Sequence, residues 1–430
     1  PPLFFPHFPP TRITNSIPKS SAPPPPLLPP APCRRRCRTL PGEVFLRLPS
    51  DDLACLLRAS LTCRRWRRIL ADPAFRRRHG GLHRMPAVLG LFHIVTSAAP
   101  YLSRYVPVNT ASRRPAGRDL PGWFILDCRH GRALFATPSP SLDTHLALDL
   151  LVWDPLTGEQ RHLPRPSPPP TANLLFNAAV LCAAGVEEGC DHRGCHGGAF
   201  RVVYLFTRWT RDGMYATSAR VYSSETGSWS KRASVRHLYV QTECTPSPSA
   251  YVGDALYFRG NMSCAFEYQL GTHRLSVVNG PRLSRERGKF ISLVSLEDGG
   301  LLCTDMELRP SPLLRLWSRE SGPDGVARWA RGRGFELETL LPNGALLALP
   351  LLFPMPNAAV VGFAEGTDVI FVATRPIRNS DAVYMVQLNS GKVTKVLECC
   401  TMIFPYTSFC IPVIDAACTG KGAGEGVSSA

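Results

Sequence analysis

The sequence predicts an α+β multidomain protein, in which a short module of three helices precedes an all-β propeller of about six blades. Apolar residues recur at helical spacing over residues 40–79, and from about Val88 they alternate with polar ones. One hairpin pattern then recurs along the β-rich part, which predicts a ring of similar units. The expected segments are a disordered, Pro-rich, basic tether at 1–38, the helical module at 39–82, the propeller at 88–415 and a disordered tail at 416–430.

The tether is expected because 13 of the first 32 residues are proline and the basic run RRRCR follows. Such a segment cannot bury enough apolar surface to offset the entropy lost on ordering. The positive charge of the chain also lies near this end. Of 49 basic and 33 acidic side chains, residues 1–118 hold 20 and 4, and residues 119–430 hold 29 and 29. A neutral β-rich part argues against nucleic-acid binding over the full length.

Helix signals are dense in the helical module. Ser50 followed by Asp51 and Asp52 is typical of a helix start, and Asp72-Pro73 opens a further short helix. The side chains expected to point inward recur at helical spacing: Leu53, Leu56, Leu57, Leu61, Trp66, Ile69 and Leu70. The side chains expected on the outer face are Arg64, Arg65, Arg67 and Arg68.

The hairpin unit of the β-rich part is an apolar strand, a polar turn with a Gly, and a second strand. It occurs as FILDCRHGRALFATP, LLVWDPLTGEQRHLP, SARVYSSETGSWSKR, CAFEYQLGTHRLSVV and AVYMVQLNSGKVTKVL. Companion hairpins are YVGDALYFRGN, SLEDGGLLCTDME and AEGTDVIFVATR. The turn glycines Gly158, Gly227, Gly271, Gly322 and Gly391 recur at intervals that suit blades of roughly 40–50 residues with loop insertions. A ring of four-stranded blades therefore fits better than a two-sheet sandwich.

The 15 cysteines are scattered and no secretory signal precedes them, which predicts a reduced, intracellular protein. The most membrane-like run, residues 344–364, contains Pro350, Pro354 and Pro356, which would break a spanning helix. We therefore expect two buried strands around a loop there, and no membrane partner.

Residues 40–75 resemble the F-box, the short helical motif that docks on the Skp-type adaptor of cullin-RING ubiquitin ligases. The matching positions follow the family's order: Leu40-Pro41, Glu43-Val44, Leu48-Pro49, Asp52-Leu53, Ser60-Leu61, Cys63-Arg64, Trp66-Arg67 and Phe75. The β-rich domain behind them, with its WDPLTGE turn, resembles the kelch-like, F-box-associated propeller of plant F-box proteins.

This resemblance implies a non-catalytic substrate-recognition subunit of an SCF-type E3 ubiquitin ligase, cytoplasmic or nuclear, without cofactor or metal. The F-box would bind the adaptor and, through it, the cullin-RING complex, while the propeller holds a protein substrate that the sequence does not name. The residues to which the resemblance assigns adaptor binding are Leu40, Pro41, Val44, Leu48, Pro49, Leu53, Leu57 and Trp66. A core role explains Leu57 and Trp66 equally well, whereas Val44 and Pro49 favour docking.

Two departures from the family pattern bear on adaptor binding. About four residues, roughly one helical turn, are missing between Leu40-Pro41 and Leu48-Pro49. The shortening would weaken the adaptor complex if Leu40-Pro41 does not take the place of the family's Leu-Pro. Thr62 stands where the family prefers Val; a buried hydroxyl needs a partner, and a helical Thr can bond back to its own backbone.

Two other functions stay open. The clusters RRRCR, RRWRR and RRRH beside a three-helix unit also describe a helix-turn-helix reader of nucleic acid, although the Arg-rich helix has no Asn or Gln to read bases. The second open function is that of a propeller scaffold that has lost adaptor binding. No enzyme motif stands where its chemistry needs it. Cys190, His192, Cys195 and His196 supply four zinc-type ligands, but their crowding without a second pair favours a Gly-rich loop.

Overall fold

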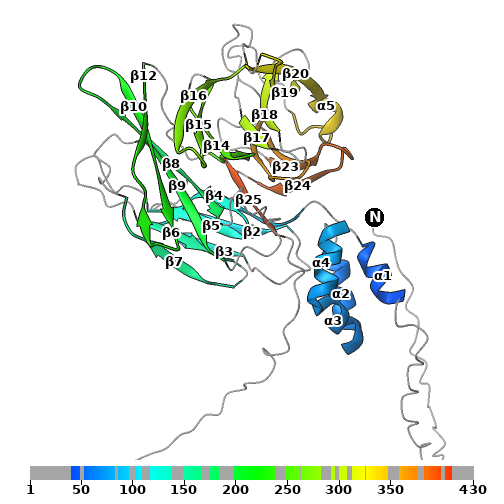
Figure 1. Cartoon of the computed structure of the whole chain (residues 1–430). Helices are drawn as coiled ribbons and strands as arrows, with labels where there is room; N and C mark the ends of the chain where they lie inside the picture. The colour runs from blue at the N-terminus through cyan, green and yellow to red at the C-terminus, as the bar shows by residue number, and fades with distance from the viewer. Residues whose placement is uncertain are drawn as a thin grey trace, which may run out of the picture.

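The computed structural model of the chain places short helices before a ring of β-sheets (Figure 1). It describes residues 40–48, 53–82, 86–95, 102–108, 117–137, 149–155, 157–166, 175–183, 198–238, 247–261, 263–281, 292–295, 300–307, 312–324, 326–346, 358–374, 382–398 and 402–408. The tether and tail predicted at 1–38 and 416–430 lie outside these residues, so both stay predictions.

The helical module contains α1 (Leu40–Leu46), α2 (Leu53–Thr62), α3 (Arg64–Ala71) and α4 (Pro73–Leu82). All four helices contribute buried side chains to one small core, made of Phe45, Leu46, Leu56, Ala59, Leu70 and Phe75. Leu48, Trp66 and Ile69 are partly buried and pack against it. A core of this size supplies little free energy of folding by itself, which favours completion against a partner.

The module has one helix more than the three predicted, because α1 forms separately before the helix expected from Ser50. Its buried residues Phe45 and Leu46 fix it to the core. The predicted start of the last helix is confirmed, since the Ala74 N–H donates to Asp72 Oδ1 at 2.8 Å.

Cys63 separates α2 from α3. Its backbone is extended, with φ −157° and ψ 160°. The break leaves Leu61 at the end of α2 with 55% of its surface exposed, so the prediction that Leu61 points inward is wrong. Of the outer-face arginines, Arg64 and Arg68 are exposed as predicted, whereas Arg65 and Arg67 are half-buried.

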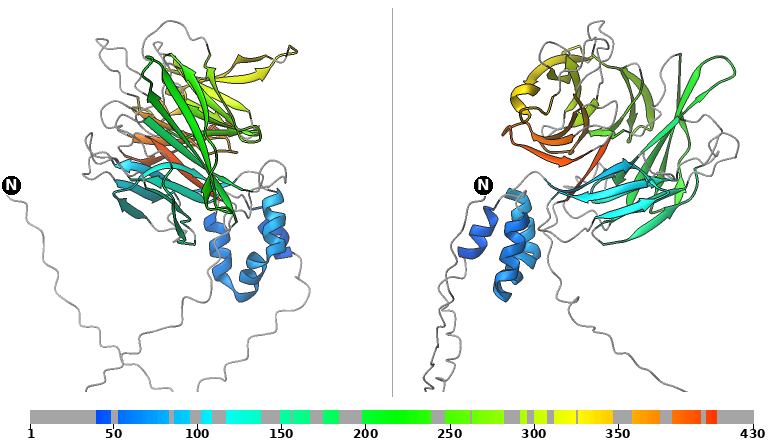
Figure 2. Two further views of the ribbon diagram at one scale, coloured as in Figure 1. Left: turned by 60° about the vertical axis from the view of Figure 1, so that its left-hand side comes forward. Right: turned by 180° about the vertical axis from the view of Figure 1, so that it is seen from behind.

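The β-rich part forms six antiparallel sheets arranged as the blades of a propeller, which confirms the predicted fold class (Figures 1 and 2). Blade 1 contains β1 (Ala87–Val95), β2 (Leu102–Pro107), β3 (Arg118–Pro121) and β25 (Ile403–Ser408). Blade 2 contains β4 (Phe124–Arg129), β5 (Arg132–Ala136), β6 (Leu150–Trp153) and β7 (Gln160–Leu163). Blade 3 contains β8 (Leu175–Cys182), β9 (Phe200–Trp209), β10 (Tyr215–Ser223), β11 (Ser228–Trp229) and β12 (Ala233–His237).

The remaining blades each have four strands. Blade 4 contains β13 (Ala250–Val252), β14 (Ala255–Arg259), β15 (Cys264–Gln269) and β16 (Arg274–Asn279). Blade 5 contains β17 (Ser292–Ser295), β18 (Leu301–Glu307), β19 (Leu313–Ser321) and β20 (Ala327–Glu336), and α5 (Leu337–Leu340) follows it. Blade 6 contains β21 (Ala358–Phe363), β22 (Val369–Thr374), β23 (Ala382–Gln387) and β24 (Val393–Leu397).

The hairpins predicted from the repeats all form, as β4–β5, β6–β7, β10–β11, β13–β14, β15–β16, β17–β18, β21–β22 and β23–β24. The turn glycines Gly158, Gly227 and Gly391 have φ of 79°, 65° and 68°, which other residues rarely adopt. In the β15–β16 turn, His273 rather than Gly271 takes the left-handed conformation, with φ 52°.

One turn-to-turn bond recurs in blades 4 and 6. Asp254 Oδ2 accepts the Gly271 N–H at 2.8 Å, and Asp368 Oδ2 accepts the Asn389 N–H at 3.1 Å. In each blade the bond links the turn of the first hairpin to the turn of the second. The recurring sequence unit is therefore matched by a recurring contact.

The ring closes because the last strand pairs with the first. β25 lies antiparallel to β1, and both flank a buried aromatic group. The ring centroid of Phe92 is 4.8 Å from that of Tyr105 and 6.5 Å from that of Tyr406. The Tyr105 ring covers Gly90, where a Cβ would collide with it. Glycine is therefore required at this point of β1.

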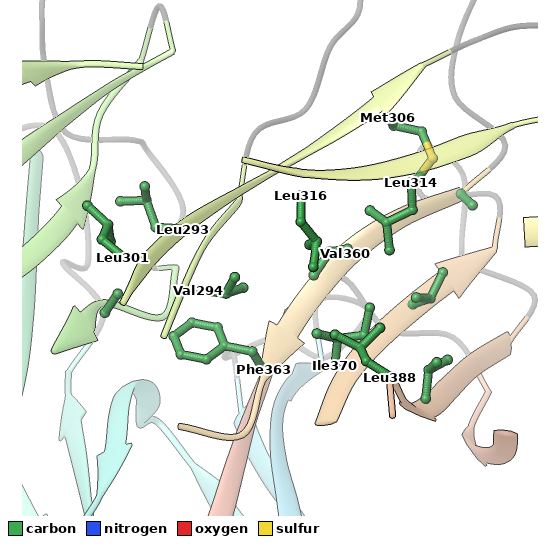
Figure 3. Close-up of a cluster of buried hydrophobic side chains, with 14 of the residues drawn as sticks. Leu293, Val294, Leu301, Met306, Leu314, Leu316, Val360, Phe363, Ile370 and Leu388 are labelled. Carbon is green, nitrogen blue, oxygen red and sulfur yellow. The ribbon is translucent and has the colours of Figure 1, made fainter. Parts of the chain in front are cut away.

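The predicted buried strands within 344–364 form in part. β21 is fully buried as the second of them, but residues 344–346 lie in a turn after α5 and 347–357 are outside the described residues. Figure 3 shows how β21 packs, with Val360 and Phe363 facing Leu293, Val294 and Leu316. No helix in the described part of the chain is long and apolar enough to cross a membrane.

Gly362 is where the last blade meets the closing strand, and a substitution there tests ring closure. It lies at a bulge of β21, and a Cβ would collide with the carbonyl oxygen of Ile403 in β25. Since backbone must move, we expect Gly362→Ala to lower the free energy of unfolding by about 1–3 kcal/mol, measured by denaturant titration. In Gly300→Ala the new Cβ meets open space, so the change should stay within about 0.5 kcal/mol. Equal losses in the two variants would contradict the closure argument.

Candidate functional site

The helical module presents an apolar stripe on α1 and the turn after it. Its members are Pro41 and Val44, about one helical turn apart on α1, and Leu48 in the turn after it, which also packs against the core. Val44 is 54% exposed, while Pro41 and Leu48 are half-buried. Phe45 and Leu46, by contrast, are buried in the core. One side of α1 therefore completes the core, and the other offers apolar surface to a partner.

Three contacts orient α1 on the rest of the module. Glu43 Oε1 accepts from Arg78 Nη2 at 2.9 Å, but both side chains are more than half exposed, so the pair adds little stability. The Phe45 ring meets the Trp66 ring edge to face, with centroids 5.0 Å apart. The buried His79 places Nε2 3.1 Å from the Leu48 carbonyl oxygen. The aromatic contact and His79 thus fix α1 and the turn that ends it.

The residues predicted to bind the adaptor have different positions in the module. Val44, with Pro41 and Leu48, forms the apolar stripe, whereas Trp66 is half-buried against Phe45 and has a core role. Leu40 begins α1, Leu53 begins α2 and Leu57 follows one turn later. Pro49 lies outside the described residues.

Leu61 is an apolar surface residue that the sequence analysis misplaced. Its neighbour Thr62 is exposed rather than buried, and its Oγ1 donates to the Arg58 carbonyl oxygen at 3.0 Å. The back-bond expected for a helical Thr is therefore present. The signal that could have placed Leu61 on the surface is the polar end of α2, at Thr62 and Cys63.

In the propeller, a buried arginine links several blades. Arg129 ends β4, and its side chain is 4% exposed. Its Nη1 donates to Asp127 Oδ2 at 2.8 Å, its Nη2 to the Ser249 carbonyl oxygen at 2.6 Å, and its Nε to Glu365. Asp127 also accepts the Val180 N–H of β8 at 2.8 Å. Blades 2, 3, 4 and 6 thus share one ion network.

This network is structural in character. Burial raises the pKa of the Asp127 carboxyl to about 6, while the Arg129 charge and the Val180 N–H act in the opposite direction. Each nitrogen of the Arg129 guanidinium already donates to an oxygen. The guanidinium therefore acts as a bridge between blades.

A cleft of about 300 Å³ lies between blades 2 and 3. Two guanidiniums, of Arg132 and Arg161, lie 5.4 and 5.6 Å from the centroid of the Phe200 ring in its wall. Acidic residues, Asp154, Glu159 and Glu225, line the same cleft. Its mixed charge points to no single class of ligand.

The sequence segment with Cys190, His192, Cys195 and His196 lies outside the described residues. Within the described residues, no group of three or more His, Cys, Asp and Glu side chains could hold a metal ion.

Residues 38–80 match a family model described as F-box-like. The chain therefore contains an F-box-like domain followed by a six-blade β-propeller. The comparison with curated proteins gave no match.

Several solved structures are similar to this chain at low identity. One is a putative 6-phosphogluconolactonase from Bacteroides fragilis, 8% identical over 73% of this chain and 97% of that chain, with a TM-score of 0.33. A putative 6-phosphogluconolactonase from Bacteroides uniformis is 9% identical over 73% and 99%, with a TM-score of 0.35. The SapL1 lectin in complex with alpha methyl fucoside is 9% identical over 74% and 98%, with a TM-score of 0.34. Similarities this weak carry no conclusion about activity.

Replacing Arg129 tests whether the buried ion network stabilises the propeller more than an exposed ion pair does. Arg129→Met leaves two carboxylates without their cation, so we expect a loss of about 3–5 kcal/mol in the free energy of unfolding. Because Asp127 takes up a proton near pH 6, the loss should be smaller at pH 5 than at pH 8. Arg165→Met removes an exposed arginine, also 2.8 Å from its Asp149 partner, and should cost less than about 1 kcal/mol. Denaturant titration at both pH values measures this, and a pH-independent loss would refute the role given to Asp127.

Proposed function

We propose that this protein is the substrate-recognition subunit of an SCF-type cullin-RING E3 ubiquitin ligase. The observation that carries the proposal is the F-box-like match at residues 38–80, which coincides with a compact helical module exposing Val44 on one side. The propeller that follows supplies long hairpins and loops on a rigid ring, a form suited to holding another protein.

In this proposal the helical module docks on the Skp-type adaptor through Pro41, Val44 and Leu48, and the propeller binds a protein substrate. Other subunits carry the ubiquitin and catalyse its transfer, so this chain contributes effective concentration and orientation, without a cofactor. The place of action is the cytoplasm or the nucleus. The resemblance of the WDPLTGE segment, which joins β6 to β7, supports the proposal of a kelch-like relative of plant F-box proteins.

The two alternative functions make different demands on the module. Nucleic-acid binding would use exposed arginines such as Arg64 and Arg68, and its affinity would fall steeply as salt rises. A scaffold without ligase assembly would leave the apolar stripe unoccupied. Adaptor binding that depends on Val44 distinguishes the ligase subunit from both.

The test is a pull-down of the full chain with purified Skp-type adaptor. Val44→Asp places a charge in the middle of the apolar stripe, where desolvation on docking penalises it. We expect adaptor affinity to fall on the order of tenfold or more, measured by titration calorimetry. Since Val44 is more than half exposed, the variant should unfold at the same temperature as the wild type.

Leu82→Asp is the matched control. Leu82 is also an exposed apolar residue of the module, at 63%, but it lies beyond the F-box-like residues. This variant should bind the adaptor like the wild type. If the wild type fails to bind under conditions in which another F-box protein binds, the ligase proposal fails.

A further inference from the structure

Blade 3 differs from the other blades in its outer edge. β9 and β10 are 10 and 9 residues long, and two separate strands pair with β10. β11 pairs with its end at Tyr222 and Ser223, whereas β12 pairs with its start, from Tyr215 to Ala219. The end of β9, the start of β10 and β12 form a three-stranded extension, residues 207–217 and 233–238, which we call the blade 3 tip. Figure 1 shows β10 and β12 reaching out at the upper left.

Three rings cross the blade 3 tip, one from each strand. Trp209 lies opposite Tyr215, and Tyr215 lies opposite His237. The first two rings meet edge to face with centroids 4.6 Å apart, and the second two stack at 6.2 Å. Trp209 is 60% exposed, and Leu238, next to His237, is 54% exposed. Exposed Trp beside Tyr is the composition typical of binding hot spots.

The inner end of this aromatic row is anchored in the propeller. His237 Nε2 lies 2.8 Å from Thr217 Oγ1, which lies 2.7 Å from Thr207 Oγ1. Both threonines are buried. The His237 ring also packs on the buried Phe266 of blade 4, with centroids 5.4 Å apart. The row is therefore held in place before any partner arrives, which lowers the entropy cost of binding.

The blade 3 tip is positively charged, although residues 119–430 hold equal numbers of basic and acidic side chains. It carries three exposed arginines, Arg208, Arg211 and Arg236. Its one acidic side chain, Asp212, is ion-paired with Arg236 at 3.0 Å. The strand register places Arg208 and Arg236 on the face opposite the aromatic row, because both lie opposite Ala216, whereas Arg211 lies in the turn two residues after Trp209. An acidic segment that crosses this turn and carries an apolar residue is therefore the complementary partner.

We propose that the blade 3 tip is a docking site for an acidic segment of a substrate protein, which crosses the turn at Arg211 and places a hydrophobic side chain against Trp209. The apolar contact supplies the binding energy, Arg211 orients the acidic residues, and the positive charge of the whole tip attracts them. The word substrate rests on the proposed ligase function, whereas the docking chemistry rests on the blade 3 tip alone.

The experiment selects short peptides from a random library displayed on phage, using the full chain as the target. We expect the enriched peptides to combine Asp or Glu with Trp, Phe or Leu, and their affinity to fall as salt rises. Trp209→Ala should weaken synthesised peptides on the order of tenfold or more, measured by fluorescence anisotropy. The charge reversal Arg208→Glu with Arg211→Glu should weaken them as well.

Val326→Ala is the control, since Val326 is a 52% exposed apolar residue in the turn of the other long hairpin, β19–β20. Its peptide affinity should equal that of the wild type. The proposal is overturned if no peptide is enriched, if the enriched peptides are not acidic, or if Trp209→Ala binds them unchanged. A single-stranded oligonucleotide that displaces the peptides and binds more tightly would also overturn it, in favour of nucleic acid.

Adaptor binding separates this proposal from the ligase function. Trp209→Ala should bind the Skp-type adaptor like the wild type, because the helical module is unchanged. If the wild type binds peptides at the blade 3 tip but never the adaptor, the ligase function fails and the docking site remains as that of a scaffold. If it binds the adaptor but no acidic peptide, the docking site alone fails.

Discussion

Closure of the ring by β25 is the constraint on which the rest of the propeller depends. β25 completes blade 1 from a position some 300 residues beyond β1 in the chain, so pairing them carries a large loop-closure entropy. Closure also removes the exposed edges that β1 and β25 would otherwise present to other chains. Two glycines permit the approach: Gly362 admits the backbone of Ile403, and Gly90 admits the ring of Tyr105. The Ile403 backbone at Gly362 and the Tyr105 ring at Gly90 thus lie where a Cβ would otherwise be.

Packing between blades is apolar, and apolar contacts are not directional, so polar bonds set how neighbouring blades face one another. Arg129 does this for four blades at once. Ser103 accepts the Ile125 N–H at 2.8 Å between blades 1 and 2, and Ser292 donates to the Val360 carbonyl oxygen at 2.8 Å between blades 5 and 6. A buried arginine is tolerated because two carboxylates and a carbonyl oxygen pair with it. Since Glu365 and Ser249 belong to other blades, the network is complete only when the blades are correctly assembled.

The sequence predicted what is local and missed what depends on distant contacts. The hairpins follow from strand alternation and turn glycines, and Asp72 caps α4 as its position before Pro73 indicates. The apolar residues keep helical spacing through Cys63 in the sequence, which predicted that Leu61 points inward. The backbone at Cys63 is extended, so the helix is interrupted there and the prediction fails. Arg129 had no signal, since its partners Ser249 and Glu365 lie over 100 and 200 residues away. The exposure of Trp209 likewise depends on β8, which in the described residues pairs with β9 only as far as Thr207.

The positive net charge of the chain comes from its first 118 residues, so it does not report the charge of individual surfaces elsewhere. The excess lies within residues 1–118, while the charge of the blade 3 tip is hidden in a neutral total. Val44 and Trp209 expose apolar surface on separate folding units, one a small helical core and the other a closed ring. Neither side chain is needed to complete its own core, so each surface can bind a partner without unfolding anything. Under the proposed ligase function, two independent surfaces on one chain would raise the effective concentration of one partner near the other without a conformational change.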